Sequence, residues 1–378
     1  MTMQLYNYRK KRKRRLSRTV CSHSHHRHHH RRRRHSSPGR RAGKAVLITA
    51  VVLLVIAAAG FGGFTILRST GKSDLMKYAG AVQMDLKDAQ DESGLVSKNG
   101  KKYRYNEDII TLLCMGVDQG SESWEEARSE GENGQADAIF LAVLDQKAHS
   151  LKLIGISRDT MTDIATYDRQ GNYVGESRNH LALAFSYGIS KQEGAELVKD
   201  AVSNLFYHLP IHGYVAIDWD ALGKINDSVG GVAVTLTEDM ILAGEPYSEG
   251  DTVRLNAEQT KSYVRYRGDA LGSNNARMNR QKTYANAFIQ EASAAIRKDP
   301  LLVADLYQEL TSDMATSIGV NEAVYLASLL PSIQFDMEDI QMVEGKVRQG
   351  ARYEEFYADE EKLMELILET FYQEVQER

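Results

Sequence analysis

The stretch YVRYRGDALGSNNARMNRQ, residues 263–281, concentrates guanidinium groups in a region otherwise rich in acid. The alternation in SYVRYR predicts a strand that carries Arg265 and Arg267 on one face. A helix is predicted to begin at Arg277, and Gln281, at position i+4, lies on the same helix face. Their N–H donors suit carboxylate or phosphate oxygens, and a helix N-terminus adds backbone N–H groups. Because like charges repel, the cluster needs an anion, which is either a set of internal acids or a phosphate or pyrophosphate ligand.

Carboxylates stand at the ends of the apolar segments that come earlier in the chain. Asp118 follows LLCMGV, Asp137 begins DAIFLAV, and the pair Arg158-Asp159 follows LKLIGIS. In open α/β sheets the strand ends line the ligand crevice. Asp118 and Asp137, on neighbouring strands, can share Mg²⁺ (or Mn²⁺) with substrate phosphates and water. The alternative for each aspartate taken alone is a turn or cap residue.

Strands and helices interleave along residues 107–378. Strands are predicted at Asp108–Asp118, Asp137–Asp145, Ser150–Thr160, Gly213–Trp219 and Gly231–Leu236. Helices are predicted at Lys191–Phe206, Arg277–Ile296, Asn321–Ile333 and Asp359–Val375. This order predicts an α/β fold, a layered α-β-α domain with a central mixed sheet that includes the C-terminal helices.

The 378-residue chain divides sharply by charge, although its net charge is only −4. Of the 47 Lys and Arg residues, 16 fall in Met1–Lys44, which has no acid; the other 31 stand against 51 acidic residues, a formal charge of −20. The two parts are therefore expected to meet different partners. Cys21 and Cys114 lie in these different parts, and Cys114 is predicted to be a small core residue rather than half of a disulfide.

Residues Ala45–Leu67 form one apolar run without a charge. At about 1.5 Å per residue this run can cross a hydrocarbon core of about 30 Å as a transmembrane helix. Lys and Arg crowd its N-terminal side, so the positive-inside rule places the N-terminus in the cytoplasm and the main domain outside. A cleaved signal peptide, the alternative, has a shorter apolar core followed by a small-residue site. The predicted organisation is an arm (1–44), a single span (45–67), a stalk (68–106) and an extracellular domain (107–378) in the cell membrane.

The arm is rich in His and Arg and has few large apolar residues, so it is expected to be disordered. A polybasic segment beside a span is attracted to anionic lipid head groups by about 1 kcal/mol per charge near the surface. Nucleic acid or another partner is the alternative, but nucleic acid is disfavoured because no folded reader motif accompanies the charges. The histidines between His23 and His30 offer metal ligands, yet the guanidinium groups beside them oppose a cation.

Six motifs follow the predicted span in a fixed order: LLCMGVDQG, QADAIFLAVLD, LIGISRDT, INDSVGGVAV, LNAEQTKSYVRYRGD and RMNRQ. In this order they resemble the LytR-CpsA-Psr (LCP) family of cell-envelope glycopolymer transferases, from about Asp108 to Gln290. The resemblance implies an α/β domain outside the membrane, with a long apolar tunnel for a polyprenyl chain. It also implies transfer of a glycopolymer, such as teichoic acid or capsule, from a polyprenyl-pyrophosphate carrier to peptidoglycan.

The resemblance also implies roles for single residues. By position, Asp118 and Asp137 resemble the family's metal carboxylates. The family's pyrophosphate ligands correspond by resemblance to five residues of this chain: Arg158, Arg265, Arg267, Arg277 and Gln281. Arg158, Asp159 and Asp137 form the expected catalytic group, in which Asp159 or Asp137 takes the proton of the acceptor.

This chain departs from the family pattern in four places. Gln119-Gly120 stand where an arginine is usual, Gln135-Ala136 replace Arg-Ser, and Ser157 replaces a proline. The insert Ser121–Gly134 is longer than usual and acidic. The missing guanidinium group is expected to weaken binding of the pyrophosphate head group or of the acceptor.

The residues and the resemblance together favour a membrane-anchored, Mg²⁺-assisted phosphotransferase. Preorganised arginines and a divalent cation stabilise a phosphate leaving group as its charge grows. The alternative is a non-catalytic regulator of envelope assembly that binds polyprenyl pyrophosphate through the same residues.

Overall fold

The structure is a computed structural model that describes residues 64–75, 95–118, 134–168, 170–266, 273–333, 335–350 and 353–375. The chain divides into two units, Met1–Ala57 and Ala58–Arg378, and all described residues belong to the second. The predicted arm, residues 45–63 of the predicted span, Arg267 and residues 119–133 lie outside the described ranges. Within those ranges, no helix has both the length and the apolar composition that a membrane crossing requires.

A six-stranded mixed sheet forms the middle layer, in the order β13-β8-β3-β4-β5-β14. Its strands are β3 (Ile109–Asp118), β4 (Gln135–Asp145), β5 (Ser150–Ile156), β8 (Gly213–Ile217), β13 (Met314–Thr316) and β14 (Ile340–Met342). β3 runs parallel to β8 and antiparallel to β4, while β5 is antiparallel to β4 and parallel to β14. The predicted α/β fold with a mixed central sheet is therefore confirmed.

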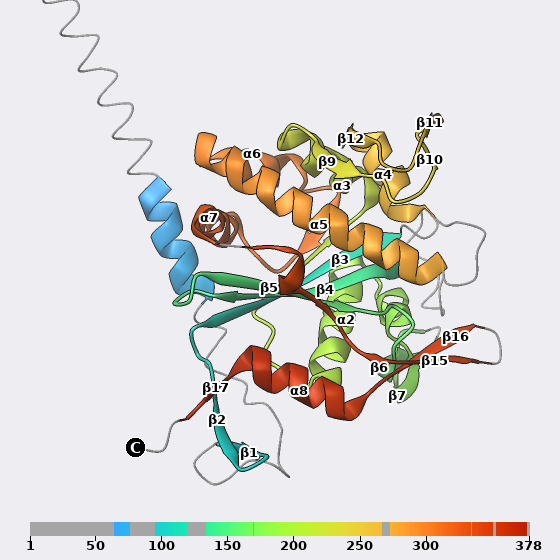
Figure 1. Cartoon of the computed structure of the whole chain (residues 1–378). Coiled ribbons are helices and arrows are strands. Elements are labelled where there is room, and N and C mark those ends of the chain that lie inside the picture. Colours follow the sequence, from blue (N-terminus) through green and yellow to red (C-terminus); the bar gives the residue numbers. More distant parts are fainter. Residues whose placement is uncertain are drawn as a thin grey trace, which may run out of the picture. The chain divides into compact units, whose positions relative to one another are not determined.

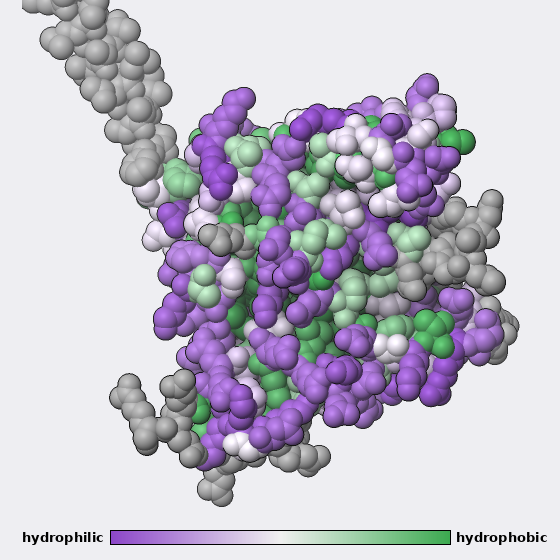
Figure 2. Space-filling view, viewed as in Figure 1, coloured by the Kyte–Doolittle hydropathy of each residue, from purple (hydrophilic) through white to green (hydrophobic). Residues whose placement is uncertain are grey.

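Helices cover both faces of this sheet (Figure 1). On one face lie α2 (Lys191–Leu205) and α8 (Glu360–Phe371). On the other lie α3 (Trp219–Ser228), α4 (Ala257–Arg265), α5 (Ser273–Lys298), α6 (Leu302–Glu309) and α7 (Val320–Leu329). The 3₁₀ helices are η1 (Leu181–Tyr187), η2 (Leu330–Ser332) and η3 (Met337–Asp339). On the face shown in Figure 2, polar side chains cover most of the surface, and apolar ones appear mainly in recesses between the layers.

Short strands pair outside the central sheet. They are β1 (Val96–Lys98) and β2 (Lys101–Tyr105) with β17 (Tyr372–Glu374), β6 (Met161–Tyr167) with β7 (Tyr173–His180), β9 (Val232–Thr235) with β12 (Thr252–Leu255), β10 (Met240–Leu242) with β11 (Glu245–Tyr247), and β15 (Gly345–Gln349) with β16 (Glu354–Ala358). The predicted stalk therefore contributes two strands, which pair with each other, and the second of them, β2, also pairs with β17. A helix over residues 64–75 also buries Leu75 in the core beside Tyr325 of α7.

Alternate residues of β3 face the two helical layers. Leu113 and Met115 pack in the core on the α2 and α8 side, where Val198 and Ile367 are also buried. Cys114 and Gly116 face the opposite way, toward α3 and α5. An added Cβ on Gly116 would lie 3.3 Å from the Cβ of its cross-strand neighbour Ala138, so the sheet carries little side-chain volume on this side.

Two predicted elements near the arginine cluster are wrong. SYVRYR does not form a strand, because α4 occupies residues 257–265. The side chains of Asn256 and Gln259 form a capping box that starts this helix, and Tyr263 and Val264 bury its apolar face. In addition, α5 begins at Ser273, so Arg277 lies one turn inside the helix and not at its N-terminus.

Candidate active site

A polar cavity of about 300 Å³ opens where the ends of β3, α3 and α4 meet β4 and α5. Its lining consists of Asp118, Asp137, Trp219, Val264, Arg265, Arg277 and Gln281. Five of these are residues that the sequence singled out: Asp118, Asp137, Arg265, Arg277 and Gln281. The fold therefore gathers side chains that lie up to 163 positions apart in the chain around one cavity.

Asp137 reaches this cavity because of a β-bulge. Gly116 pairs with Ala138 and Val117 pairs with Ala136, so Asp137 is the extra residue on β4. A bulge bends the strand locally and re-aims the side chain of the extra residue. The carboxylate of Asp137 thereby lines the same cavity as that of Asp118, which ends β3.

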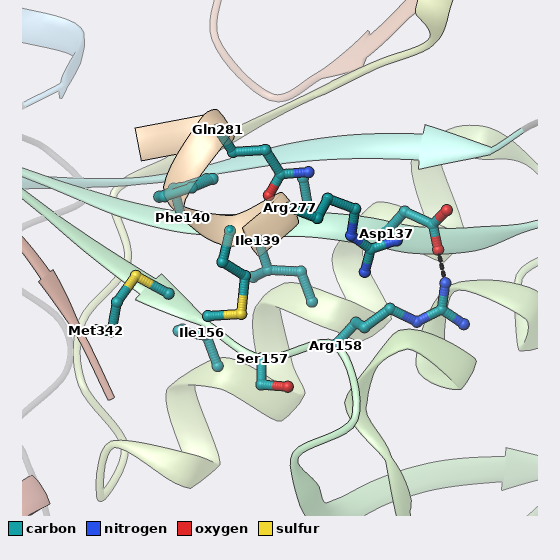
Figure 3. A pocket seen from close by; sticks show the side chains of 11 residues that line it. Asp137, Ile139, Phe140, Ile156, Ser157, Arg158, Arg277, Gln281 and Met342 are labelled. Atoms are coloured by element: carbon teal, nitrogen blue, oxygen red, sulfur yellow. Dashed lines mark hydrogen bonds and ion pairs between the residues drawn. The ribbon is translucent and has the colours of Figure 1, made fainter. Parts of the chain in front are cut away.

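Arg158 lies in the turn after β5, and its guanidinium group is held by protein acceptors. It forms an ion pair with Asp137 (Figure 3). It also donates a hydrogen bond to the side-chain oxygen of Gln135. Arg158, Asp137 and Arg277 line a narrow pocket of about 20 Å³. That volume holds roughly one water-sized group. Arg158 and Asp137 therefore close one end of a space that fits a single hydroxyl.

Asp159 follows Arg158 but lines neither the polar cavity nor the narrow pocket. Its carboxylate lies 3.5 Å from Nε of Arg158 and 3.8 Å from Nδ1 of His180, at the end of β7. The structure thus places Asp137, and not Asp159, among the residues that surround the cavity.

Arg277 and Gln281 share one face of α5, as their i, i+4 spacing predicts. Both line the polar cavity and the narrow pocket, and Arg277 is only 6% exposed. Arg265 ends α4 and is exposed, with its guanidinium carbon 5.0 Å from the centre of the Trp219 ring. Arg265 therefore approaches the cavity from a second helix, over an aromatic ring that holds it in place.

Arg280 belongs to the protein's own ion pairs. It is buried, pairs with Glu238 and donates a hydrogen bond of 2.5 Å to the backbone carbonyl of Tyr266. This arginine fixes the end of α4 against the segment after β9. For Arg280, the internal-acid explanation of the arginine cluster holds.

An apolar cavity of about 270 Å³ adjoins the polar one. The two share Trp219, Val264 and Gln281. Its sheet side is formed by Cys114, Gly116, Ala138, Phe140, Val215 and Ile217, and its helix side includes Leu222, Ile225, Tyr284 and Ala285. The small residues at its centre leave unfilled the space that larger side chains would occupy in an ordinary core.

Relatives of the chain share this arrangement of elements. A sequence profile of the LytR_cpsA_psr family matches residues 70–370. The chain belongs to this family. The resemblance found in the sequence motifs is thereby confirmed.

Two teichoic acid transferases are among the proteins of the LytR-CpsA-Psr family that are similar in sequence to this chain. Polyisoprenyl-teichoic acid–peptidoglycan teichoic acid transferase TagV of Bacillus subtilis is 25% identical over 64% of this chain and 60% of its own length. TagU of Halalkalibacterium halodurans, a transferase of the same description, is 27% identical over 50% of this chain and 54% of its own length. The matches thus span less than two thirds of these relatives.

Solved structures of the family share the fold. The crystal structure of B. subtilis TagV has a TM-score of 0.54 at 24% identity, over 68% of this chain and 94% of that one. The structure of TagT bound to LIIa-WTA has a TM-score of 0.52 at 19% identity, over 70% of this chain and 89% of that one. At these identities the likeness concerns the fold alone.

This LytR-CpsA-Psr chain has two site residues that the sequence did not assign to the site, although Gln135 was noted as a departure from the family pattern. Gln135 binds Arg158 because positions 135 and 137 of β4 project to the same face. Trp219 lines both cavities, because Asp218 caps the start of α3 and sets the indole at their junction. The indole Nε1 is buried and has no hydrogen-bond partner within the described ranges. A donor of this kind is suited to an oxygen of a bound ligand.

The donor set of the polar cavity fits a divalent cation such as Mg²⁺. Asp118 and Asp137 come from adjacent strands and face one space, and Mg²⁺ in proteins takes one or two carboxylates plus phosphates and water. Among the described residues, no group of three or more His, Cys, Asp or Glu side chains forms a metal cage. A cation held here would therefore complete its coordination with oxygens from a ligand or from water.

The thiol of Cys114 lines the apolar cavity without being reactive. Burial raises its pKa to about 11, so it remains protonated at neutral pH. Burial also raises the pKa of the Tyr284 hydroxyl, whose oxygen lies 3.3 Å from Oδ1 of Asn226. Both groups are therefore neutral, as an apolar lining requires.

Proposed function

We propose that the chain is a membrane-anchored phosphotransferase that moves a glycopolymer from a polyprenyl-pyrophosphate carrier to peptidoglycan, assisted by Mg²⁺. One observation carries this proposal: a cavity lined by arginines and carboxylates joins an apolar cavity through Trp219, Val264 and Gln281. A polyprenyl diphosphate has the same two halves, one anionic and one apolar. The names of TagV and TagU, which specify teichoic acid and peptidoglycan, support the substrate class.

The anchor of the proposed enzyme is the apolar run Ala45–Leu67. The basic residues before it favour a cytoplasmic arm and an extracellular catalytic domain. The arm, with its 16 positive charges, would rest on anionic lipid at the inner surface.

In the proposed reaction, an acceptor hydroxyl of peptidoglycan attacks the phosphorus that carries the glycopolymer. A bond forms between the acceptor oxygen and this phosphorus, and the bond to the bridging oxygen of the diphosphate breaks. Polyprenyl phosphate leaves with the electron pair, and the acceptor proton passes to a carboxylate. Asp137 is the nearer base by position, because Asp159 does not line the cavity.

The chain's own cations provide most of the stabilisation in this scheme. Arg277 and Arg265 face the diphosphate, and Gln281 adds an amide donor where the tail cavity begins. Fixed donors directed at developing charge are usually the largest single contribution to such catalysis. A bound Mg²⁺, held by Asp118 and Asp137, would supply further neutralisation of the phosphate oxygens.

The reaction itself is the test of this proposal. Purified full-length protein in detergent is incubated with a lipid-linked glycopolymer, peptidoglycan and Mg²⁺, and polyprenyl phosphate and peptidoglycan-bound glycan are both quantified. Equal amounts of the two products are expected. Tight carrier binding without either product would instead support the non-catalytic regulator, and absence of carrier binding would contradict both.

Filling the apolar cavity is expected to weaken binding of long-chain carriers selectively. In Cys114→Phe the phenyl ring occupies part of the space of about 270 Å³. Preventing the burial of even two methylene groups costs about 1.6 kcal/mol, or roughly tenfold in affinity. Calorimetry with a long-chain polyprenyl diphosphate and with inorganic pyrophosphate measures the difference. Cys114→Ala, which keeps the cavity open, is the control; equal loss for both ligands would argue against a tail site here.

A further inference from the structure

A groove of about 430 Å³ lies beside the candidate active site, between α5 and the segment that joins β14 to β15. Its lining includes Met278, Asn279, Lys282, Met342, Glu344 and Phe356. Met278 and Met342 also line the narrow pocket that contains Asp137, Arg158 and Arg277. In Figure 3, Met342 lies at the end of that pocket away from Asp137 and Arg158. The groove is therefore a continuation of the pocket and not a separate surface feature.

We propose that this groove binds the acceptor saccharide, a segment of the peptidoglycan glycan strand, and directs its hydroxyl into the narrow pocket. The inference rests on the proposed function, because it assigns the second substrate of the same reaction. The class of ligand is a hydroxyl-rich saccharide that also carries an anionic group.

The way in which the cavities adjoin one another supports binding of the acceptor in the groove. The apolar cavity shares residues with both the polar cavity and the narrow pocket, and the polar cavity shares Asp137, Arg277 and Gln281 with the narrow pocket. The groove shares residues with the narrow pocket alone. In phosphoryl transfer the attacking and leaving oxygens lie roughly in line through phosphorus. If the lipid phosphate leaves toward Trp219, the attacking oxygen must enter from the far side, where the groove opens.

The narrow pocket sets a size limit on what passes between groove and cavity. Its volume of about 20 Å³ accommodates about one hydroxyl or water. Met342 lies against the backbone of Gly155, where an added Cβ would come within 2.4 Å of its sulfur, so this thioether is held close to the sheet. An acceptor hydroxyl can therefore enter, whereas a whole sugar ring remains in the groove.

The side chains of the groove suit a saccharide. Phe356 is half-buried and offers an apolar ring, while Asn279 and Glu344 are exposed and offer hydrogen-bonding groups. Lys282 is half-buried and lines the groove, and within the described ranges its ammonium group has no ion pair or hydrogen bond. A lysine that lines the groove without a protein partner favours an anionic group on the ligand.

Phe356 connects the groove to the turn that holds Arg158. Its backbone N–H donates a hydrogen bond of 2.9 Å to the carbonyl oxygen of Asp159, and it forms a bridge with Thr160. Its ring lies so close to Gly345 that a Cβ there would come within 2.6 Å of it. Figure 1 shows the β15–β16 hairpin below one end of α5, the helix that carries Lys282. A saccharide that packs on Phe356 would therefore lie at a fixed position relative to the turn that contains Arg158.

Binding measurements on single variants test this assignment. The probes are a soluble disaccharide–peptide released from peptidoglycan, a lipid-linked glycopolymer, and a polyprenyl pyrophosphate without sugar. Lys282→Ala is expected to weaken binding of the disaccharide–peptide about tenfold or more, the usual effect of losing a charged hydrogen bond. Its binding of sugar-free polyprenyl pyrophosphate should stay within about twofold of wild type. Lys298→Ala, the same change at an exposed position of α5, is the control.

Asn279→Ala provides a second variant, since this exposed side chain has no role in packing and should weaken the same probe in the same direction. Unchanged disaccharide–peptide affinity in both variants would overturn the inference. A loss seen for the lipid-linked glycopolymer alone would also overturn it, because the groove would then belong to the donor glycan. Failure of the wild type to bind sugar-free polyprenyl pyrophosphate would instead contradict the proposed function itself.

Discussion

Replacing Arg277 by alanine is expected to reduce glycopolymer transfer by about 100-fold to 1000-fold, the range seen when one preorganised donor to a developing anion is removed. Arg277 is almost fully buried and lines both the polar cavity and the narrow pocket. Its guanidinium group therefore faces the diphosphate and the site of attack at once. Product release is measured at saturating carrier, and carrier affinity is measured separately.

Two further variants separate the effect of the Arg277 side-chain geometry from the effect of removing a positive charge from α5. Arg277→Lys retains the charge but loses the planar fork, so transfer should stay well below wild type. Arg297 lies on the same helix, where its exposed guanidinium group donates a hydrogen bond to the carbonyl of Pro331, and Arg297→Ala should transfer normally. Full activity in Arg277→Ala would contradict the assignment of the polar cavity as the diphosphate site.

Replacing Asp137 by asparagine is expected to reduce transfer by at least about 100-fold and to raise the Mg²⁺ concentration needed for half-maximal activity. The asparagine side chain has nearly the same shape but carries no charge. It therefore removes the ion pair with Arg158, a carboxylate facing Asp118 and the nearer proton acceptor.

The Mg²⁺ dependence separates the two roles of Asp137. Chelation with EDTA should abolish activity of the wild type, and added Mg²⁺ should restore it; Asp163→Asn, an exposed change on β6, should follow the wild-type curve. An Asp137→Asn variant with wild-type turnover and an unchanged Mg²⁺ curve would remove Asp137 from the site.

The sequence predicted the parts of the fold that depend on long apolar runs. β3 and β4 were predictable because ten or more residues of nearly continuous apolar or alternating character leave few alternatives to a buried strand. Arg277 and Gln281 were predictable as a pair because i, i+4 spacing fixes their common face in any helix. The region before α5 was not, because alternation in SYVRYR is too short to outweigh the capping box at Asn256 and the burial of Tyr263.

The remaining site features depend on contacts between distant segments. The bulge that turns Asp137 toward the cavity depends on how β4 pairs with β3, and no residue type within β4 predicts it. Trp219 becomes a site residue only because α3 packs beside α4 and brings the indole under Arg265. The apolar cavity results from Gly116, Ala138 and Ala285 lying on facing elements. Each is small for ordinary reasons, and only the packed structure shows that their small volumes coincide.

A structure of the protein with a short polyprenyl diphosphate and Mg²⁺ tests the central claim most directly. The account predicts the diphosphate in the polar cavity, within hydrogen-bonding distance of Arg277 and Gln281, with the cation at Asp118 and Asp137. The isoprenoid chain should pass Trp219 and lie against Cys114 and Ala285. A diphosphate bound elsewhere, or a tail directed into the groove beside Lys282 and Phe356, would contradict it.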